Sequence, residues 1–411
     1  MFRCPNNVGM AEIDHKASNK GKIVAAKPRR KEEIMVGRKS IFSLFLVTCI
    51  FLGVHKRCRV LGAEDTLPRE IEFRRYFSSY NFSIDWEALV DLKNNPILNA
   101  CMEGATSAEL ESLQIPDLAA RRQKLQSGNL IRKIDQHYHL NFPAITGNKR
   151  VELEKLVDQV SLKLLPITQK MTQEIAAHLK GQEQMLYHVV WSIVMDGQVA
   201  WITLDNELKK QLGKGDVSIT GTSWWKYPNH RYRAGTNSYG DLQTGQAKIT
   251  WSPNTPMPPV IYEIIKRYEI ELIQSTTTGK PVEDLSARQA LAKYGLADGK
   301  GIGRVYIIDP SSETTQVFGK FSQAFGKEFM KRIDVQEAAK MLGVTPVQAL
   351  LIVYHELCYE LLEQLAIKGI LEIPEVVLKP NAGTDHTYRL ISIIDLTKLK
   401  SLDQLKSKLN L

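Results

Sequence analysis

The sequence contains few cysteines, and none of them form a C-x-x-C pair. The five, in a chain of 411 residues, are Cys4, Cys49, Cys58, Cys101 and Cys358. A zinc site of the C-x-x-C type is therefore excluded. Because only Cys101 and Cys358 fall in the part that we expect to be globular, no disulfide framework is predicted and a reducing compartment is compatible with the composition. A single bridge between these two cysteines remains an alternative.

The patterns that accompany common catalytic sites are also absent. No G-x-S-x-G motif occurs, and the stretch YHELCYE at 354–360 has Tyr359 where a zinc-protease helix needs its second histidine. The glycine-rich run GKGIGR at 299–304 precedes a predicted strand, so no helix N-terminus would face a phosphate. We therefore predict that the chain is not an enzyme and that it has no catalytic residues, cofactor or metal site.

The composition is that of a globular protein with a basic excess. Charged residues make up 24% and hydrophobic residues 43%, and the length predicts two or three domains. The net charge of +9 favours an anionic partner such as nucleic acid or a membrane surface. Much of the excess lies before residue 60, however, so a basic tail alone would account for it.

The first 63 residues predict a tail followed by a targeting segment. Residues 1–40 are polar, basic and without a pattern, which is typical of disorder. Within 41–63, the run Ile41–Val54 is an uncharged apolar stretch of 14 residues, shorter than the about 17 that a membrane span needs and typical of a signal-peptide core. Basic residues on both sides leave three alternatives: a cleaved signal, an uncleaved membrane anchor, or a buried core helix. We favour the first two.

The most informative stretch is ATSAELESLQIPDLAARRQKLQSGNLIRKIDQHYHLNFP, residues 105–143. Thr106 and Glu109 have the spacing of a capping box, which predicts a helix over 107–113. Pro116 suits the first turn of a second helix, whose Arg121, Arg122 and Lys124 we expect to point outward, and Gly128 is a natural stop. Residues 130–133 and 138–142 then predict two short strands that meet at Asp135-Gln136.

This order of helix, turn, basic helix and β-hairpin resembles that of winged helix regulators over residues 85–146. The resemblance implies that the second helix enters the major groove of double-stranded DNA while the hairpin contacts the flanking backbone. It also implies a transcription-regulator-like protein, with a homodimer as a possible state. The residues that would contact DNA are Arg121, Arg122 and Lys124 on the helix and Arg132, Lys133 and His137 on the hairpin.

A second candidate site falls in an aromatic-rich segment. Five of the six tryptophans lie between residues 191 and 251. In the loop KYPNHRYRAGTNSYG, residues 226–240, arginines sit among aromatic residues, as in pockets for anionic or planar ligands. An ordered structural loop is the favoured alternative. The residues of this possible ligand pocket are Trp225, Tyr227, His230, Arg231, Arg233 and Asn237.

The C-terminal part repeats the order of the first unit more loosely. Residues 335–342 predict a short helix, and Thr345 and Pro346 begin a long helix that ends near Ile367. We expect 373–379 and 388–396 to pair as a hairpin through Asn381-Ala382-Gly383. The long helix carries few positive charges on its outward face, which makes DNA binding doubtful there.

Together these patterns predict a helix-rich α+β fold with a winged helix-like N-terminal unit, an aromatic-rich mixed central domain and a C-terminal helix-turn-helix-like unit with a β-hairpin. The alternative function is that of an exported or membrane-anchored binding or assembly protein, whose winged folds contact proteins and whose residues 41–54 contact the membrane. A DNA-binding chain would be cytoplasmic or anchored facing the cytoplasm, whereas a cleaved signal would make it extracytoplasmic. The predicted segments are a basic tail (1–40), a signal or anchor (41–63), the winged helix-like domain (64–147), linker or dimerisation helices (148–212), the central domain (213–320) and the C-terminal unit (321–411).

Overall fold

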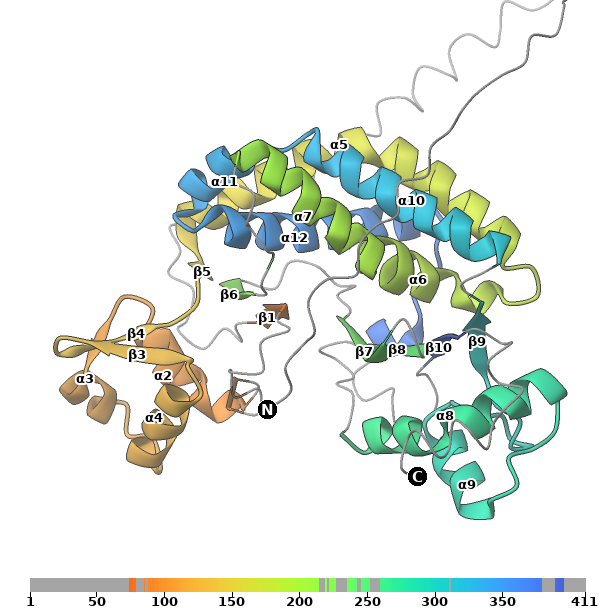
Figure 1. The fold of residues 1–411 in the computed structure, drawn as a ribbon. Coiled ribbons are helices and arrows are strands. Elements are labelled where there is room, and N and C mark those ends of the chain that lie inside the picture. The colour runs from red at the N-terminus through yellow and green to blue at the C-terminus, as the bar shows by residue number, and fades with distance from the viewer. Residues whose placement is uncertain are drawn as a thin grey trace, which may run out of the picture. The chain divides into compact units, whose positions relative to one another are not determined.

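The structure is a computed structural model. It describes residues 74–78, 85, 88–89, 91–213, 219, 222–226, 235–241, 245–251, 259–309, 312–378 and 389–394. The predicted tail and the signal or anchor segment lie outside the described residues. Within these ranges the fold is α+β and rich in helix, as predicted (Figure 1).

A small unit contains the stretch that resembles a winged helix. Its elements are η1 (Leu92–Asn94), α2 (Asn95–Ala100), β2 (Ala105–Thr106), α3 (Ser107–Ser112), α4 (Leu118–Ser127), β3 (Ile131–Ile134) and β4 (His137–Leu140). The predicted capping box is present: Thr106 Oγ1 accepts from the Glu109 backbone N–H at 3.2 Å, and Glu109 Oε2 accepts from the Thr106 N–H at 2.7 Å. Two backbone groups that α3 would otherwise leave unsatisfied are thereby paired.

Two details at the ends of α4 differ from the prediction. Pro116 lies in the turn before the helix, which begins at Leu118, and Asp117 takes a left-handed φ of 57°. Gly128 follows the helix at a φ of −80°, while the left-handed residue is Asn129 at 56°. Glycine is still needed at 128, because a Cβ there would lie 2.5 Å from Asp85 Cβ.

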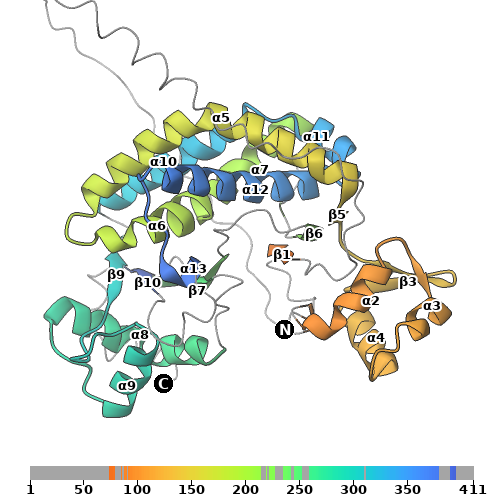
Figure 2. The ribbon, with the colours of Figure 1, turned by 180° about the vertical axis from the view of Figure 1, so that it is seen from behind.

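A larger set of elements surrounds a second core. Helices α5, α7, α10 and α12 pack against one another in this set, as both ribbon views show (Figures 1 and 2). The helices are α5 (Gly147–His178), η2 (Glu183–Met185), α6 (Leu186–Val189), the π-helix η3 (Val190–Met195), α7 (Gln198–Leu212), α8 (Pro259–Thr278), α9 (Leu285–Lys293), α10 (Glu313–Met330), α11 (Val335–Leu342), α12 (Pro346–Ile367) and α13 (Glu375–Leu378). The strands are β1 (Arg74–Ser78), β5 (Ala144–Ile145), β6 (Thr222–Lys226), β7 (Gly235–Asp241), β8 (Gly245–Trp251), β9 (Val305–Ile308) and β10 (Leu390–Ile393).

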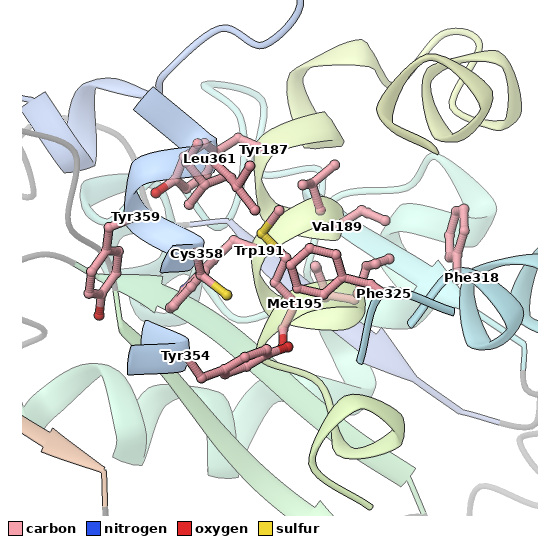
Figure 3. Close-up of a cluster of buried hydrophobic side chains, with 14 of the residues drawn as sticks. Tyr187, Val189, Trp191, Met195, Phe318, Phe325, Tyr354, Cys358, Tyr359 and Leu361 are labelled. Carbon is pink, nitrogen blue, oxygen red and sulfur yellow. The ribbon is translucent and has the colours of Figure 1, made fainter. Parts of the chain in front are cut away.

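Helix α12 is the centre of this core. All its residues from Ala349 to Glu363 are buried, so the helix is enclosed on every side. Figure 3 shows Tyr354 of α12 near Met195 of η3 and Phe325 of α10. The Tyr354 hydroxyl donates to the Met195 carbonyl at 2.5 Å, which satisfies a polar atom that burial would otherwise leave unpaired.

Helix α5 contains Pro166 in its interior, yet it runs on for 32 residues without a break. Proline removes one helical hydrogen bond and crowds the preceding turn. Buried residues on both sides of it, from Leu164 to Met171, belong to the large core, and α5 packs along α12. Burial of this apolar face holds the helix continuous in spite of the local cost.

The predicted C-terminal hairpin is wrong. The sequence at 375–378 forms α13, and β10 pairs with other strands: antiparallel to β8, with Leu390 opposite Ile249, and parallel to β9, with Leu390 opposite Val305. The sheet order is β7-β8-β10-β9. Since β10 finds partners far away in sequence, local alternation could not reveal them. The expected turn at 381–383 lies outside the described residues.

The aromatic-rich segment contributes strands β6, β7 and β8. β7 and β8 form a hairpin, while β6 pairs antiparallel to β1 and parallel to β5. Ala247 and Ile249 of β8 belong to the same core as α5 and α12. The packing of this segment is thus continuous with that of the helices before and after it.

Candidate nucleic-acid interface

The three strands of the small unit form one sheet in the order β2-β4-β3. Ala105 of β2 is opposite Tyr138 of β4, and β3 and β4 form a hairpin in which Ile134 is opposite His137. Helices α3 and α4 lie between β2 and the hairpin in sequence. Strand β2 was missed by the sequence analysis, because two residues are too few to show alternation.

A compact apolar cluster fixes α3 and α4 in this unit. Leu110 of α3 and Leu125 of α4 are fully buried in it, together with Ile131 and Tyr138 of the hairpin. Burial of these side chains therefore determines which faces of α4 and of the hairpin are exposed to solvent. Its other buried members are Ala88, Leu89, Ile97, Leu98, Cys101, Ala105, Leu130 and Phe142.

Arg121 does not point outward, in contrast to the prediction. Its Nη1 donates to Asp91 Oδ2 at 2.9 Å and to Asn94 Oδ1 at 3.0 Å, and its side chain is 20% exposed. Burial raises the pKa of Asp91, but the Arg121 hydrogen bond and the Lys93 backbone N–H outweigh it, so the pKa is lowered overall. Arg121 thus ties α4 to the segment before α2 and is not available to a phosphate in this conformation.

Arg122 and Lys124 are also engaged within the unit. The Arg122 guanidinium lies 5.1 Å from the centre of the Tyr138 ring, a cation–π distance, and the residue is half-buried. Lys124 Nζ is 3.8 Å from Asp85 Oδ2, but about half of its side chain is exposed. Of the three predicted helix contacts, Lys124 is the one whose exposure suits a phosphate contact.

The exposed face of α4 combines Lys124 with residues that were not predicted to contact DNA. Ala119, Ala120, Gln123, Lys124 and Ser127 are all exposed, and their spacing of three and four residues places them on one side of the helix. The sequence contained the signal for this arrangement: Arg121 lies four residues before buried Leu125, so it belongs to the inward side. Gln123, which the sequence analysis passed over, carries an amide of the kind that reads adenine in the major groove.

The hairpin presents the basic residues predicted for it. Arg132, Lys133 and His137 are all exposed. Asp135 takes a φ of 53°, which allows the tight two-residue turn Asp135-Gln136 that was expected. Ile134, next to this turn, is 42% exposed.

The second candidate site can be followed at two of its positions. Trp225 lies in β6 opposite Arg75, and Asn237 lies in β7 opposite Ile249. The other four residues, Tyr227, His230, Arg231 and Arg233, lie outside the described residues. The ligand pocket predicted for this loop therefore stays a prediction.

A buried polar network near the π-helix was not foreseen from the sequence. His188 Nδ1 and Thr250 Oγ1 are 2.9 Å apart, and Ser192 Oγ lies 3.1 Å from Thr250 Oγ1 and 2.8 Å from Thr236 Oγ1. Burial and then the charge of Arg389 lower the pKa of His188 to about 3, so the imidazole is neutral. The network joins α6 and η3 to β7 and β8 through hydrogen bonds between uncharged groups.

A partly buried acid, Asp196 after η3, and a buried base, Lys248 of β8, lie in the elements that form this network. Burial raises the pKa of Asp196, whose carboxylate accepts from Trp201 Nε1 at 3.0 Å. Burial lowers the pKa of Lys248, and the charge of Asp196 acts against that shift. Lys248 Nζ donates to Ser238 Oγ at 2.9 Å. Within the described residues, no set of three or more His, Cys, Asp or Glu side chains is placed to hold a metal ion.

Comparison of the chain with known protein families, with curated proteins and with solved structures finds no match. In the described part of the chain, no single helix has the length and apolar character of a membrane span, whereas α11 and α12 together have that length and composition but meet at an angle of 93°. Proposals about function therefore rest on the geometry of the unit itself.

Proposed function

We propose that residues 91–142 are a winged helix-like unit that binds double-stranded DNA. The observation that carries the proposal is the sheet order β2-β4-β3 with α3 and α4 placed between β2 and the hairpin in sequence. Such an order sets a helix beside a two-stranded flap, and winged helix proteins use these two parts on DNA.

The exposed face of α4 suits close approach to a groove. Ala119, Ala120 and Ser127 are small, so they keep the backbone near the bases, while Gln123 supplies an amide and Lys124 a positive charge. On the hairpin, Arg132 and Lys133 supply charge for the phosphate backbone, and His137 adds a ring nitrogen. Binding as a homodimer, in a transcription-regulator-like protein, is part of the proposal.

The salt dependence of binding tests this proposal. Three cations, Lys124, Arg132 and Lys133, predict that the logarithm of the affinity for duplex DNA falls with the logarithm of salt concentration at a slope of about −3. Replacing two of them, in Arg132→Gln/Lys133→Gln, should reduce the slope by about 2. Fluorescence anisotropy with a labelled duplex at a series of salt concentrations measures both slopes.

A matched control is Lys266→Gln, because Lys266 is exposed on α8, outside the small unit. This variant should bind as the wild type does. Equal salt slopes for the wild type and the double variant, or no binding of any duplex by the wild type, would contradict the proposal.

A second function is favoured by exposed apolar side chains on the same unit. Ile134 at the hairpin turn is 42% exposed and Leu113 after α3 is 39% exposed, and such groups suit a protein partner better than DNA. In this alternative the chain is exported or membrane-anchored through residues 41–54. N-terminal sequencing of the mature protein, with cell fractionation, separates the two: a processed, extracytoplasmic product excludes DNA as the ligand.

A further inference from the structure

A pocket of about 440 Å³ lies between η2, α8, β9 and the start of β10. Its size falls in the range of small-molecule sites, about 300–1,000 Å³. Its charged and aromatic lining side chains are Arg304, Tyr306 and Arg389. Gln182, the residue before η2, and Gln184 within η2 add two amides. We call it the arginine-pair pocket. None of the described residues that line it is acidic.

Strand pairing brings the two arginines together. β9 and β10 run parallel with Val305 opposite Leu390, so the residues that precede them, Arg304 and Arg389, are neighbours at the same ends of adjacent strands. Arg304 is exposed and Arg389 is half-buried. Arg389 Nη1 also donates to the Gly295 carbonyl at 3.5 Å. Two like charges at neighbouring positions favour an anion placed between them.

The surroundings of Arg389 strengthen this preference for an anion. Burial lowers the pKa of Arg389, and the charge of Arg304 lowers it further. Burial raises the pKa of Tyr306 to about 12, so its phenol keeps its proton at neutral pH as a hydrogen-bond donor.

We propose that the arginine-pair pocket binds a small organic oxyanion, with a carboxylate or phosphate group held between Arg304 and Arg389. Arginine suits this role because its planar fork donates two parallel hydrogen bonds to such groups. The volume exceeds what a bare phosphate fills, so the Tyr306 phenol and the glutamine amides of 182 and 184 contact the rest of the ligand. This proposal is independent of DNA binding.

Isothermal titration of the full chain at pH 7 and low ionic strength tests the proposal, with citrate and inorganic phosphate as probes. We expect saturable binding of at least one probe and tighter binding of citrate, which fills more of the pocket. Arg304→Gln should weaken this binding about tenfold or more, because one charge-assisted contact is lost. Arg304 is exposed, so the fold should tolerate the change.

The matched control is Arg267→Gln on α8, which removes an exposed arginine outside the lining residues and should leave binding unchanged. Arg389→Lys keeps the charge but loses the fork, and it should weaken binding without changing the far-ultraviolet circular dichroism spectrum. Binding that is equal in wild type and Arg304→Gln would overturn the proposal, as would the absence of saturable binding of both probes.

Discussion

At the scale of single residues, His188 shows how burial selects a protonation state. Its ring is fully buried and shares a hydrogen bond with Thr250, while its Nε2 has no partner among the described residues. A charged imidazole would leave a second N–H donor without an acceptor in an apolar interior. The neutral form is therefore part of the folded structure.

Acid should weaken the fold through this residue. The unfolded chain binds a proton to His188 as the pH falls below 6.5, whereas the folded chain does so only near 3, so stability present above pH 6.5 is lost as the pH falls. Between pH 7 and pH 5 the loss is about 2 kcal/mol. Urea unfolding of the wild type and of His188→Asn at both pH values measures this loss. Between pH 7 and pH 5, the free energy of unfolding should fall by about 2 kcal/mol less in the variant than in the wild type.

Measuring the wild type and His188→Asn in parallel isolates the contribution of this ring. If His188→Asn and the wild type lost the same stability between pH 7 and pH 5, the assignment of the acid sensitivity to this ring would be wrong.

At the scale of elements, the π-helix η3 and the turn after it fix where α7 begins. The Asp196 backbone N–H donates to the Trp191 carbonyl at 2.7 Å, five residues back, which is the π pattern. Gly197 then caps α7, and a Cβ on it would lie 1.9 Å from the Ile193 carbonyl oxygen. Any side chain at position 197 would therefore force η3 or α7 to shift.

Alanine substitutions at two glycines should have effects of opposite sign. Gly197→Ala should destabilise the fold by at least about 2 kcal/mol, because its Cβ meets a backbone atom that cannot move independently. Gly319→Ala, within α10 and with no atom within 4 Å of the new Cβ, should stabilise it by about 0.5–1 kcal/mol. Chemical denaturation of both variants checks this; a Gly197→Ala variant as stable as the wild type would contradict the geometry.

The elements also show which parts of the fold could be predicted from the sequence. The bounds of α11 and α12 match the expectation because their ends have local signals that act within one turn. Asp334 and Gly343 cap α11, and Thr345, Pro346 and Gln348 begin α12. The C-terminal hairpin failed because β10 pairs with β8 and β9, which are distant in sequence. The π-helix could not be foreseen, since its apolar stripe is also that of an α-helix.

The candidate interface was foreseen in part for the same reason. The order of helices and hairpin follows from capping and turn residues, and the spacing of Arg121 from Leu125 indicates its inward orientation. Its partners Asp91 and Asn94, which lie before the helix pair, could not be predicted from that spacing. The arginine-pair pocket could not be predicted from the sequence. Arg304 and Arg389 lie 85 positions apart, and only the parallel pairing of β9 and β10 makes them neighbours.

At the scale of the whole molecule, the described residues contain two separate hydrophobic clusters. Leu125 is fully buried in the cluster of the small unit, and Leu357 is fully buried in the larger cluster around α12. Two hydrophobic cores unfold as separate cooperative units when fewer contacts join them than each core contains within itself. We therefore expect local destabilisation in one cluster to stay within it.

Two matched substitutions test this independence. Leu125→Ala and Leu357→Ala each remove the same buried atoms and should cost about 2–5 kcal/mol in their own cluster. Hydrogen exchange with peptide resolution should show faster exchange in 95–142 for the first variant and in α5 and α12 for the second. Faster exchange in both regions for either variant would mean that the two clusters unfold together.

The π-helix η3 affects how this segment can tolerate the loss of a residue. Each hydrogen-bonded ring of a π-helix contains one residue more than that of an α-helix. Deleting one residue from Val190–Met195 therefore allows an ordinary helical turn to form while the side chains before and after it keep nearly the same orientation. A chain one residue shorter should keep both the helix and the Asp196–Trp201 hydrogen bond, whereas the same deletion in a regular α-helix would rotate the side chains beyond it by about 100°.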